Sequence, residues 1–397
     1  MPIKSNRDWT PLILFFVLCA LWTALSVLTG ASFFGPTLYN TYTRQAMAWR
    51  QGLLHLPKDV PYLELAVYEG EYYVSFPPLP SVVLLPLTFI FGMDTPDNLL
   101  VKLYALGACL MMYQALKRAG YSPLSGGLFA FLFCFASSLL PLTLNGAVWY
   151  HAQVLAFFLT VAAVCFLSQD RPALSLLCYA LSVACRPFNA LYAVPLFLSF
   201  RLIQRRAGMT LRETAGDLLS GVLLGLGVAA LIGIYNYGRF GNPLEFGHNY
   251  LPEFSFQGGV QFSPGHVPNH LKTFLWGLPF DIVGGQVEFK RFGYSLLLAC
   301  PTVTLMLIWA IRDLIKRRMR WEKAAVVLTC LLHGYFLMWH RTMGGFQLGA
   351  RYMADLIPYT FFYLLLTPEK KKIHWAEAVF LLLILAMTLY GTTQVHI

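Results

Sequence analysis

Residues 11–31 read PLILFFVLCALWTALSVLTGA, an apolar run without a single charged side chain. A helix rises 1.5 Å per residue, so about 20 residues cross the roughly 30 Å hydrocarbon core of a bilayer. Comparable apolar runs recur as far as residue 391. The pattern predicts a polytopic, all-α integral membrane protein that forms one domain over residues 1–397.

The composition leads to the same class of protein. Of the 397 residues, 57% are hydrophobic and 12% are charged, whereas soluble domains carry about a quarter charged residues. The formal net charge of +10 comes from short basic clusters between the apolar runs, which is typical of cytoplasmic loops and does not indicate a nucleic-acid partner. The eight cysteines lie in or at the ends of apolar segments without a CxxC pair, so we expect neither disulfides nor a cysteine metal site.

We expect about 11 transmembrane helices, within a range of about 10–13. They are expected at about residues 11–31, 98–116, 124–143, 150–167, 173–185, 187–200, 215–235, 294–311, 322–340, 352–366 and 375–391. The segment 76–92 is apolar but short, and its four prolines resist a regular helix, so we expect it to lie along the interface. A topology in which 76–92 crosses and 173–200 crosses once stays open.

With 76–92 at the interface, the basic clusters fall on one side, which the positive-inside rule assigns to the cytoplasm. The N-terminus is then cytoplasmic, and the long extracytoplasmic loops are about 32–97, with interfacial helices, and 236–293. We therefore expect a multi-pass protein of the inner (plasma) membrane whose active site is extracytoplasmic.

The first of these loops holds the carboxylates that could carry chemistry. Glu64 and three other acids, Asp59, Glu69 and Glu71, come just before the stretch YYVSFPPLP at 72–80. A carboxylate held against a membrane surface could act as a general base or hold a divalent cation. The alternative is that these are solvated loop carboxylates.

Arg186, Arg341 and Arg351 are the candidate phosphate ligands. Each lies at an outer helix end or in apolar surroundings, where an unpaired charge is costly. A lipid phosphate is a suitable counter-ion, because a guanidinium can donate two parallel hydrogen bonds to it. Alternatively, these arginines snorkel to the interface or pair with carboxylates of the chain. The carboxylates in question are Asp355, Glu245 and Asp281.

Histidines and aromatic residues on the same side supply further candidates. His151, His248 and His340 could help to bind phosphate or acceptor, although a histidine in an aromatic segment is commonly structural. Aromatic rings would stack on sugar or on a prenyl chain. These aromatic residues are Tyr72, Tyr73, Phe76, Trp149 and Trp276.

Several motifs occur in a characteristic order along the chain. The first helix and acidic loop are followed by YYVSFPPLP, then by Arg186-Pro187 between two short helices, by YNYGRFGNPLEFG at 235–247 and by GARY at 349–352. In this order the chain resembles the GT-C superfamily, particularly the bacterial relatives of protein O-mannosyltransferases and aminoarabinose transferases in glycosyltransferase family 39. The resemblance covers nearly the whole chain.

The resemblance implies a membrane glycosyltransferase that moves a sugar from a polyprenyl-phosphate-linked donor to a lipid, glycan or protein acceptor on the extracytoplasmic face. It implies that Glu64, which stands where many relatives carry aspartate, is the catalytic acid of the first loop. The other residues implied to bind substrate are Tyr72, Tyr73, Pro77, Pro78, His151, Arg186, Asn236, Arg341 and Arg351. The implied partners are the lipid-linked donor and membrane lipids.

Two departures leave the metal requirement open. The stretch 38–42 lacks the acid that many relatives carry after the first helix, and the turn 145–153 lacks the acid of the mannosyltransferases. No cofactor is certain, and a divalent cation remains an alternative. A transporter or flippase for a lipid-linked saccharide is the alternative function, although the hydropathy shows no inverted repeat. A non-catalytic membrane scaffold is a third.

Overall fold

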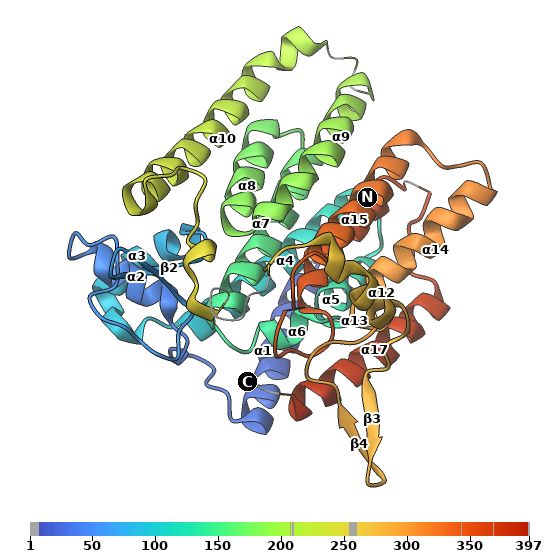
Figure 1. The fold of residues 1–397 in the computed structure, drawn as a ribbon. Coiled ribbons are helices and arrows are strands. Elements are labelled where there is room, and N and C mark those ends of the chain that lie inside the picture. Colours follow the sequence, from blue (N-terminus) through green and yellow to red (C-terminus); the bar gives the residue numbers. More distant parts are fainter. Residues whose placement is uncertain are drawn as a thin grey trace.

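Five long apolar helices form the frame of the molecule (Figure 1). The computed structural model describes residues 8–206, 208, 210–253, 260–342, 344–367 and 369–395. Within those residues, five helices have the length and composition needed to cross a membrane. They are α1 (Thr10–Thr29), α4 (Asp97–Arg118), α7 (Val148–Leu167), α10 (Leu211–Phe240) and α17 (Trp375–Gln394).

Shorter helices complete the helical body. The expected segments overlap with helices of the structure, although 124–143 and 294–311 are each divided between two helices, and the count of about 11 crossings stays a prediction. The shorter helices are α5 (Pro123–Phe135), α6 (Leu139–Leu142), α8 (Pro172–Cys185), α9 (Ala193–Arg206), α13 (Leu296–Ala299), α14 (Pro301–Ile315), α15 (Trp321–Leu337) and α16 (Ile357–Leu365). Two 3-10 helices, η2 (Pro187–Tyr192) and η5 (Arg351–Leu356), lead into α9 and α16.

Helix α7 lies at the centre of the core and α10 at its edge. In α7, 83% of the most apolar window is buried, and the helix packs against α4, α8 and α16. In α10 only 6% of that window is buried, and its main contact is with α8. Gly221 allows this contact, because a Cβ there would lie 2.7 Å from a methyl group of Leu176. An apolar helix that is exposed on most sides is suited to a lipid environment.

The expectation of one continuous helix over 124–143 was wrong. The chain leaves the helical path after α5 and resumes in α6. The Ser138 N–H donates a hydrogen bond to the Ala299 carbonyl oxygen (2.8 Å), and the Ser137 hydroxyl donates to the Cys134 carbonyl oxygen (3.1 Å). These bonds satisfy backbone groups that the interrupted helix leaves free.

The first long loop folds into a small α/β unit. It contains α2 (Thr41–Trp49), the hairpin β1 (Leu65–Tyr68) and β2 (Glu71–Val74), helix α3 (Leu79–Phe91) and η1 (Gly92–Asp94). Strands β1 and β2 are antiparallel, with Leu65 opposite Val74. The two-residue turn has φ of 51° at Glu69 and 86° at Gly70, as a tight hairpin turn requires.

Helix α3 corrects the expectation that prolines would prevent a regular helix at 76–92. Pro80 falls in the first turn, where the missing N–H is not needed, and the helix accommodates Pro86 inside it. That α3 lies along the interface and does not cross the membrane stays a prediction.

The second long loop contains η3 (His248–Tyr250), η4 (Pro264–His266), α12 (Val267–Trp276) and a second antiparallel hairpin, β3 (Phe280–Val283) and β4 (Gln286–Phe289). This hairpin projects from the body beside the end of α17 (Figure 1). The two hairpins are an addition to the all-α architecture that we expected.

Candidate functional site

A cavity of about 1050 Å³ lies where the two long loops meet the ends of α7, α8 and α15. Its wall combines the first loop, the start of α7, the junction of α8 and η2, the segment after α10 and the segment 340–352. Polar and charged side chains at the wall are Glu64, Arg186, His248, Glu253, Gln261, His340, Arg341, Thr342 and Arg351. Aromatic residues at the wall are Tyr39, Tyr42, Phe76, Trp149, Tyr150, Phe188, Phe246, Phe262, Phe346 and Tyr352.

Glu64 is held at the wall by a tryptophan. It immediately precedes β1, and its carboxylate Oε2 accepts a hydrogen bond from the indole Nε1–H of Trp149 (2.8 Å). Burial raises the pKa of the Glu64 carboxyl, whereas the Trp149 hydrogen bond and the positive charge of Arg351 lower it. A carboxylate of raised pKa is a stronger base than an exposed one.

Glu253 is the second carboxylate in the cavity. Burial and the negative charge of Glu64 both raise its pKa, so the two carboxylates are near enough to repel each other. The only sequence signal for Glu253 is its place in the second long loop, five residues after the candidate His248. Sequence reasoning nevertheless missed it.

Arg186 forms a buried ion pair. Its Nε and NH2 groups donate to Oδ2 of Asp355 at 3.0 and 2.7 Å, and Gln153 donates to Oδ1 at 2.9 Å. The pairing with Asp355 is one of the alternatives left open above. The pair fixes the guanidinium at the wall of the cavity, where 20% of the Arg186 side chain remains exposed.

Arg351 differs from Arg186, because the described part of the chain supplies it with no carboxylate partner. The residue is 5% exposed, and its Nε has no hydrogen-bond partner among the described residues. Its guanidinium lies over the rings of Tyr150 (5.3 Å) and Tyr352 (5.0 Å). Arg186 lies over the same Tyr352 ring at 5.0 Å, so one tyrosine contacts both arginines.

The remaining polar groups at the wall include Arg341 and two histidines. Arg341 donates its backbone N–H to the Gln261 carbonyl oxygen (2.7 Å). Burial lowers the pKa of His248 to about 4, and it lowers the pKa of His340 to about 4 as well. Both imidazoles are therefore neutral near pH 7.

Of the ten residues that the resemblance implied, the cavity brings together five, namely Glu64, Pro77, Arg186, Arg341 and Arg351, and the further candidates Phe76, Trp149, His248 and His340 line it as well. The other five of those ten lie outside its wall. Tyr72 and Tyr73 belong to β2, and the Tyr73 ring packs on Phe240 at 5.1 Å. Pro78 precedes α3.

Two nominated residues have structural partners instead. His151 is fully buried in α7 between the rings of Tyr42 and Tyr104, at 6.0 and 5.5 Å. Asn236 donates to the Pro243 carbonyl oxygen (3.2 Å) and accepts from Arg239 (2.7 Å). Its side chain therefore shapes the turn after α10.

The metal requirement stays open, as the sequence left it. In the part of the chain that the structure describes, no three His, Cys, Asp or Glu side chains are grouped closely enough to share a metal ion. We therefore derive no step through a metal.

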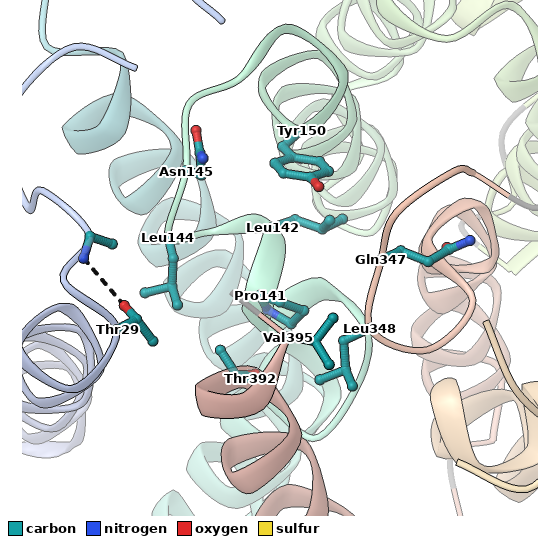
Figure 2. Close-up of a pocket in the computed structure, with 11 residues that line it drawn as sticks. Thr29, Pro141, Leu142, Leu144, Asn145, Tyr150, Gln347, Leu348, Thr392 and Val395 are labelled. Carbon is teal, nitrogen blue, oxygen red and sulfur yellow. Dashed lines mark hydrogen bonds between the residues drawn. The ribbon is translucent and has the colours of Figure 1, made fainter. Parts of the chain in front are cut away.

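Figure 2 shows a second, small cavity of about 30 Å³. It is bounded by the last turns of α1 and α17, by the segment before α7 and by the loop before η5. Tyr150 lines both cavities. Gln347 lines the small cavity and not the large one.

No protein-family model and no curated protein matches the sequence. Solved structures do match. ArnT from Cupriavidus metallidurans bound to undecaprenyl phosphate aligns over 95% of this chain and 63% of its own length, with 14% identity and a TM-score of 0.53. The apo state of the same protein aligns over 89% and 58%, with 14% identity and a TM-score of 0.52.

The oligosaccharyltransferase of Archaeoglobus fulgidus in the apo form aligns over 99% of this chain and 57% of its own length, with 12% identity and a TM-score of 0.49. The chain therefore spans about three fifths of the length of the structures it matches. The ArnT structures show that its fold is GT-C-like, which confirms the resemblance noted in the sequence.

Proposed function

We propose that this chain, whose fold is GT-C-like, is a membrane glycosyltransferase. Its donor would be a sugar linked to a polyprenyl phosphate, and its acceptor a hydroxyl or amine of a lipid, glycan or protein. One observation carries the proposal: a single cavity holds the Glu64 carboxylate together with Arg351, a buried guanidinium that has no carboxylate partner in the described chain.

Glu64 is the general base of the proposed reaction. Its carboxylate takes the proton of the acceptor as the acceptor oxygen or nitrogen bonds to the anomeric carbon. The Trp149 N–H holds Oε2 at 2.8 Å, so the carboxylate is oriented while its second oxygen remains available. General bases need this fixed geometry as well as a suitable pKa.

The arginines stabilise the group that leaves. As the bond between the anomeric carbon and the phosphate oxygen breaks, the electron pair stays on the phosphate and negative charge develops there. Arg351 and Arg341 at the wall of the cavity supply positive charge to that oxygen, and Asp355 keeps Arg186 oriented toward the same space. Preorganised charge of this kind commonly makes the greatest single contribution to the rate enhancement of an enzyme.

The proposed donor fits the surroundings of the cavity. Undecaprenyl phosphate is bound in the ArnT structure that shares this fold. The volume of about 1050 Å³ is at the upper end of the usual range for ligand sites, which suits a sugar phosphate together with an acceptor. With the N-terminus cytoplasmic, the cavity lies at the extracytoplasmic ends of the helices, where a flipped lipid donor arrives.

The experiment is transfer of a labelled sugar from polyprenyl-phosphate donors by the purified protein in lipid vesicles. Glu64→Gln should lower the rate by about 100-fold or more, the usual contribution of a general base. Glu71→Gln is the matched control, because Glu71 belongs to the same loop but pairs with His55 outside the cavity. Equal rates for both variants would remove Glu64 from the mechanism.

A further inference from the structure

Hairpin β3–β4 has one apolar face and one polar face. Side chains alternate between the two faces of a strand, and residues directly opposite each other in an antiparallel pair lie on the same face. Phe280 is opposite Phe289 and Ile282 is opposite Val287, so these apolar side chains share one face. An antiparallel pair patterned in this way packs one face on apolar material and leaves the other in a polar medium.

The opposite face carries the charges of the hairpin. Asp281 lies opposite Glu288 on this face, and the Asp281 carboxylate pairs with Lys290 at 3.1 Å. Both partners of that pair remain accessible, with 63% of the Asp281 side chain and 34% of the Lys290 side chain exposed. This face is therefore suited to water or to lipid headgroups.

The apolar face is covered at its base and open at its tip. At the base, the Phe289 ring packs on the ring of Tyr390 in α17, with centroids 5.6 Å apart. Gly391 allows this approach, because a Cβ there would lie 2.9 Å from the Phe289 ring. Toward the tip, Ile282 is 72% exposed and Val287 is 50% exposed.

A hairpin exposed to this extent requires a medium that covers it. A two-stranded hairpin alone in water is marginally stable at best. The hairpin of the first loop meets this requirement within the protein, since Leu65 and Val74 are buried. In β3 and β4, by contrast, every residue except Phe289 is exposed.

Helix α17 indicates which medium covers the hairpin. It is one of the helices long and apolar enough to cross a membrane, and only 28% of its most apolar window is buried. Leu383 and Tyr390 are two helical turns apart, so they share one side of α17, and both are exposed. The hairpin projects beside the end of this helix (Figure 1). Through the contact of Phe289 with Tyr390, its apolar face continues a helix surface that is suited to lipid.

Contacts at the base fix the hairpin on the body of the protein. The Gln347 N–H donates a hydrogen bond to the Arg291 carbonyl oxygen (2.7 Å), and the Ser295 N–H donates to the Gly277 carbonyl oxygen (2.9 Å). These bonds hold both ends of the hairpin. The direction of its apolar face relative to α17 is therefore set by the fold.

We propose that the apolar face of hairpin β3–β4 lies on the acyl chains at the surface of the leaflet in which α17 ends, and that the partner of this face is a phospholipid surface. The outer edges of two strands carry unpaired backbone groups, which need water or headgroups. The hairpin therefore lies at the headgroup boundary and not in the hydrocarbon centre. This inference goes beyond the proposed function and does not depend on it.

A fluorescent label on each face tests this placement in the full-length protein in dioleoylphosphatidylcholine vesicles. Ile282→Cys and Glu288→Cys place a nitrobenzoxadiazole label on the apolar face and on the polar face. Label on the native cysteines is measured with the unsubstituted protein and subtracted. The quenchers are a doxyl-labelled phosphatidylcholine in the bilayer and iodide in the water.

The lipid quencher should act at least about threefold more strongly on the Ile282→Cys label than on the Glu288→Cys label, because an amphipathic element at the interface buries its apolar side by about 5–10 Å. Iodide should show the reverse order. Val287→Cys should reproduce the result of Ile282→Cys, since the two positions are opposite each other. It replaces Ile282→Cys if thermal unfolding shows that the latter is not folded.

Two results would overturn the proposal. One is equal quenching of the labels on both faces by each quencher. The other is an apolar-face label that is protected from iodide but not quenched by the doxyl lipid, because a second copy of the chain or another protein would then cover the face. Sugar transfer is not part of this readout, so failure here leaves the proposed function untouched.

Discussion

The Trp149→Phe variant probes how the pKa of Glu64 is set. Burial raises this pKa, and the Trp149 hydrogen bond and the Arg351 charge lower it. Phenylalanine keeps a ring against Tyr39, whose centroid lies 5.2 Å from that of Trp149, but it removes the N–H that Oε2 accepts at 2.8 Å. The packing is largely retained while one of the two lowering effects is lost, so the pKa of Glu64 should rise.

The expected size follows from the hydrogen bond. A hydrogen bond to a charged group contributes about 1.5–3 kcal/mol, and one pKa unit corresponds to about 1.4 kcal/mol. The pKa of Glu64 should therefore rise by about one to two units. A general base acts in its deprotonated form, so the acidic limb of the rate profile moves to higher pH and activity is lost at the low-pH end first.

The assay is the pH dependence of kcat/KM for sugar transfer in vesicles. We expect the acidic limb of Trp149→Phe to shift upward by about one to two pH units and the plateau rate at high pH to fall as well, because Glu64 also loses the hydrogen bond that orients its carboxylate. Trp276→Phe is the control, because Trp276 is 78% exposed and does not line the cavity. An unshifted profile, or a shift to lower pH, would refute the assignment of Glu64 as the base.

Three further predictions concern the ion pair, the packing and the alternative function. Asp355→Asn should destabilise the protein in detergent by less than the roughly 3–5 kcal/mol of a fully buried broken pair, because 20% of the Arg186 side chain is exposed. Adding Arg186→Gln should recover part of this loss of stability. If the effects of the two substitutions simply add, the two side chains are not coupled. Gly146→Ala should lower the thermal midpoint, because its Cβ would lie 2.5 Å from the Asp97 carbonyl carbon, whereas Gly216→Ala, with no atom within 4 Å, should not. Vesicles containing the protein should show no faster transbilayer movement of a fluorescent lipid-linked saccharide, and faster movement would favour the flippase.

The helical frame was predictable because lipid imposes a simple rule on the chain. Runs such as 11–31 must satisfy their backbone within a helix, and composition alone identifies them. The break between α5 and α6 was not predictable, since Ser138 leaves the helix to donate to Ala299, a residue far away in sequence. The hairpin β3–β4 was missed despite a usable signal, because Gly284 and Gly285 separate two short runs rich in β-branched and aromatic residues.

The cavity residues were predictable in kind but not in arrangement. Charge in an apolar setting nominated Arg186 and Arg351, but only the fold shows that Arg186 is paired with Asp355 while Arg351 has no carboxylate partner among the described residues. Neither the hydrogen bond from Trp149 to Glu64 nor the approach of Gly344 to Arg351 follows from any local pattern. His151 was expected to face substrate and is instead buried, because a polar residue near a helix start can face inward as easily as outward.

An experimental structure of the protein in lipid with undecaprenyl phosphate bound tests the central claim most directly. The account predicts that the phosphate lies in the large cavity, within hydrogen-bond distance of Arg351, with the Glu64 carboxylate facing the same space. A phosphate bound outside this cavity, or a cavity wall that separates Glu64 from the phosphate, would contradict it.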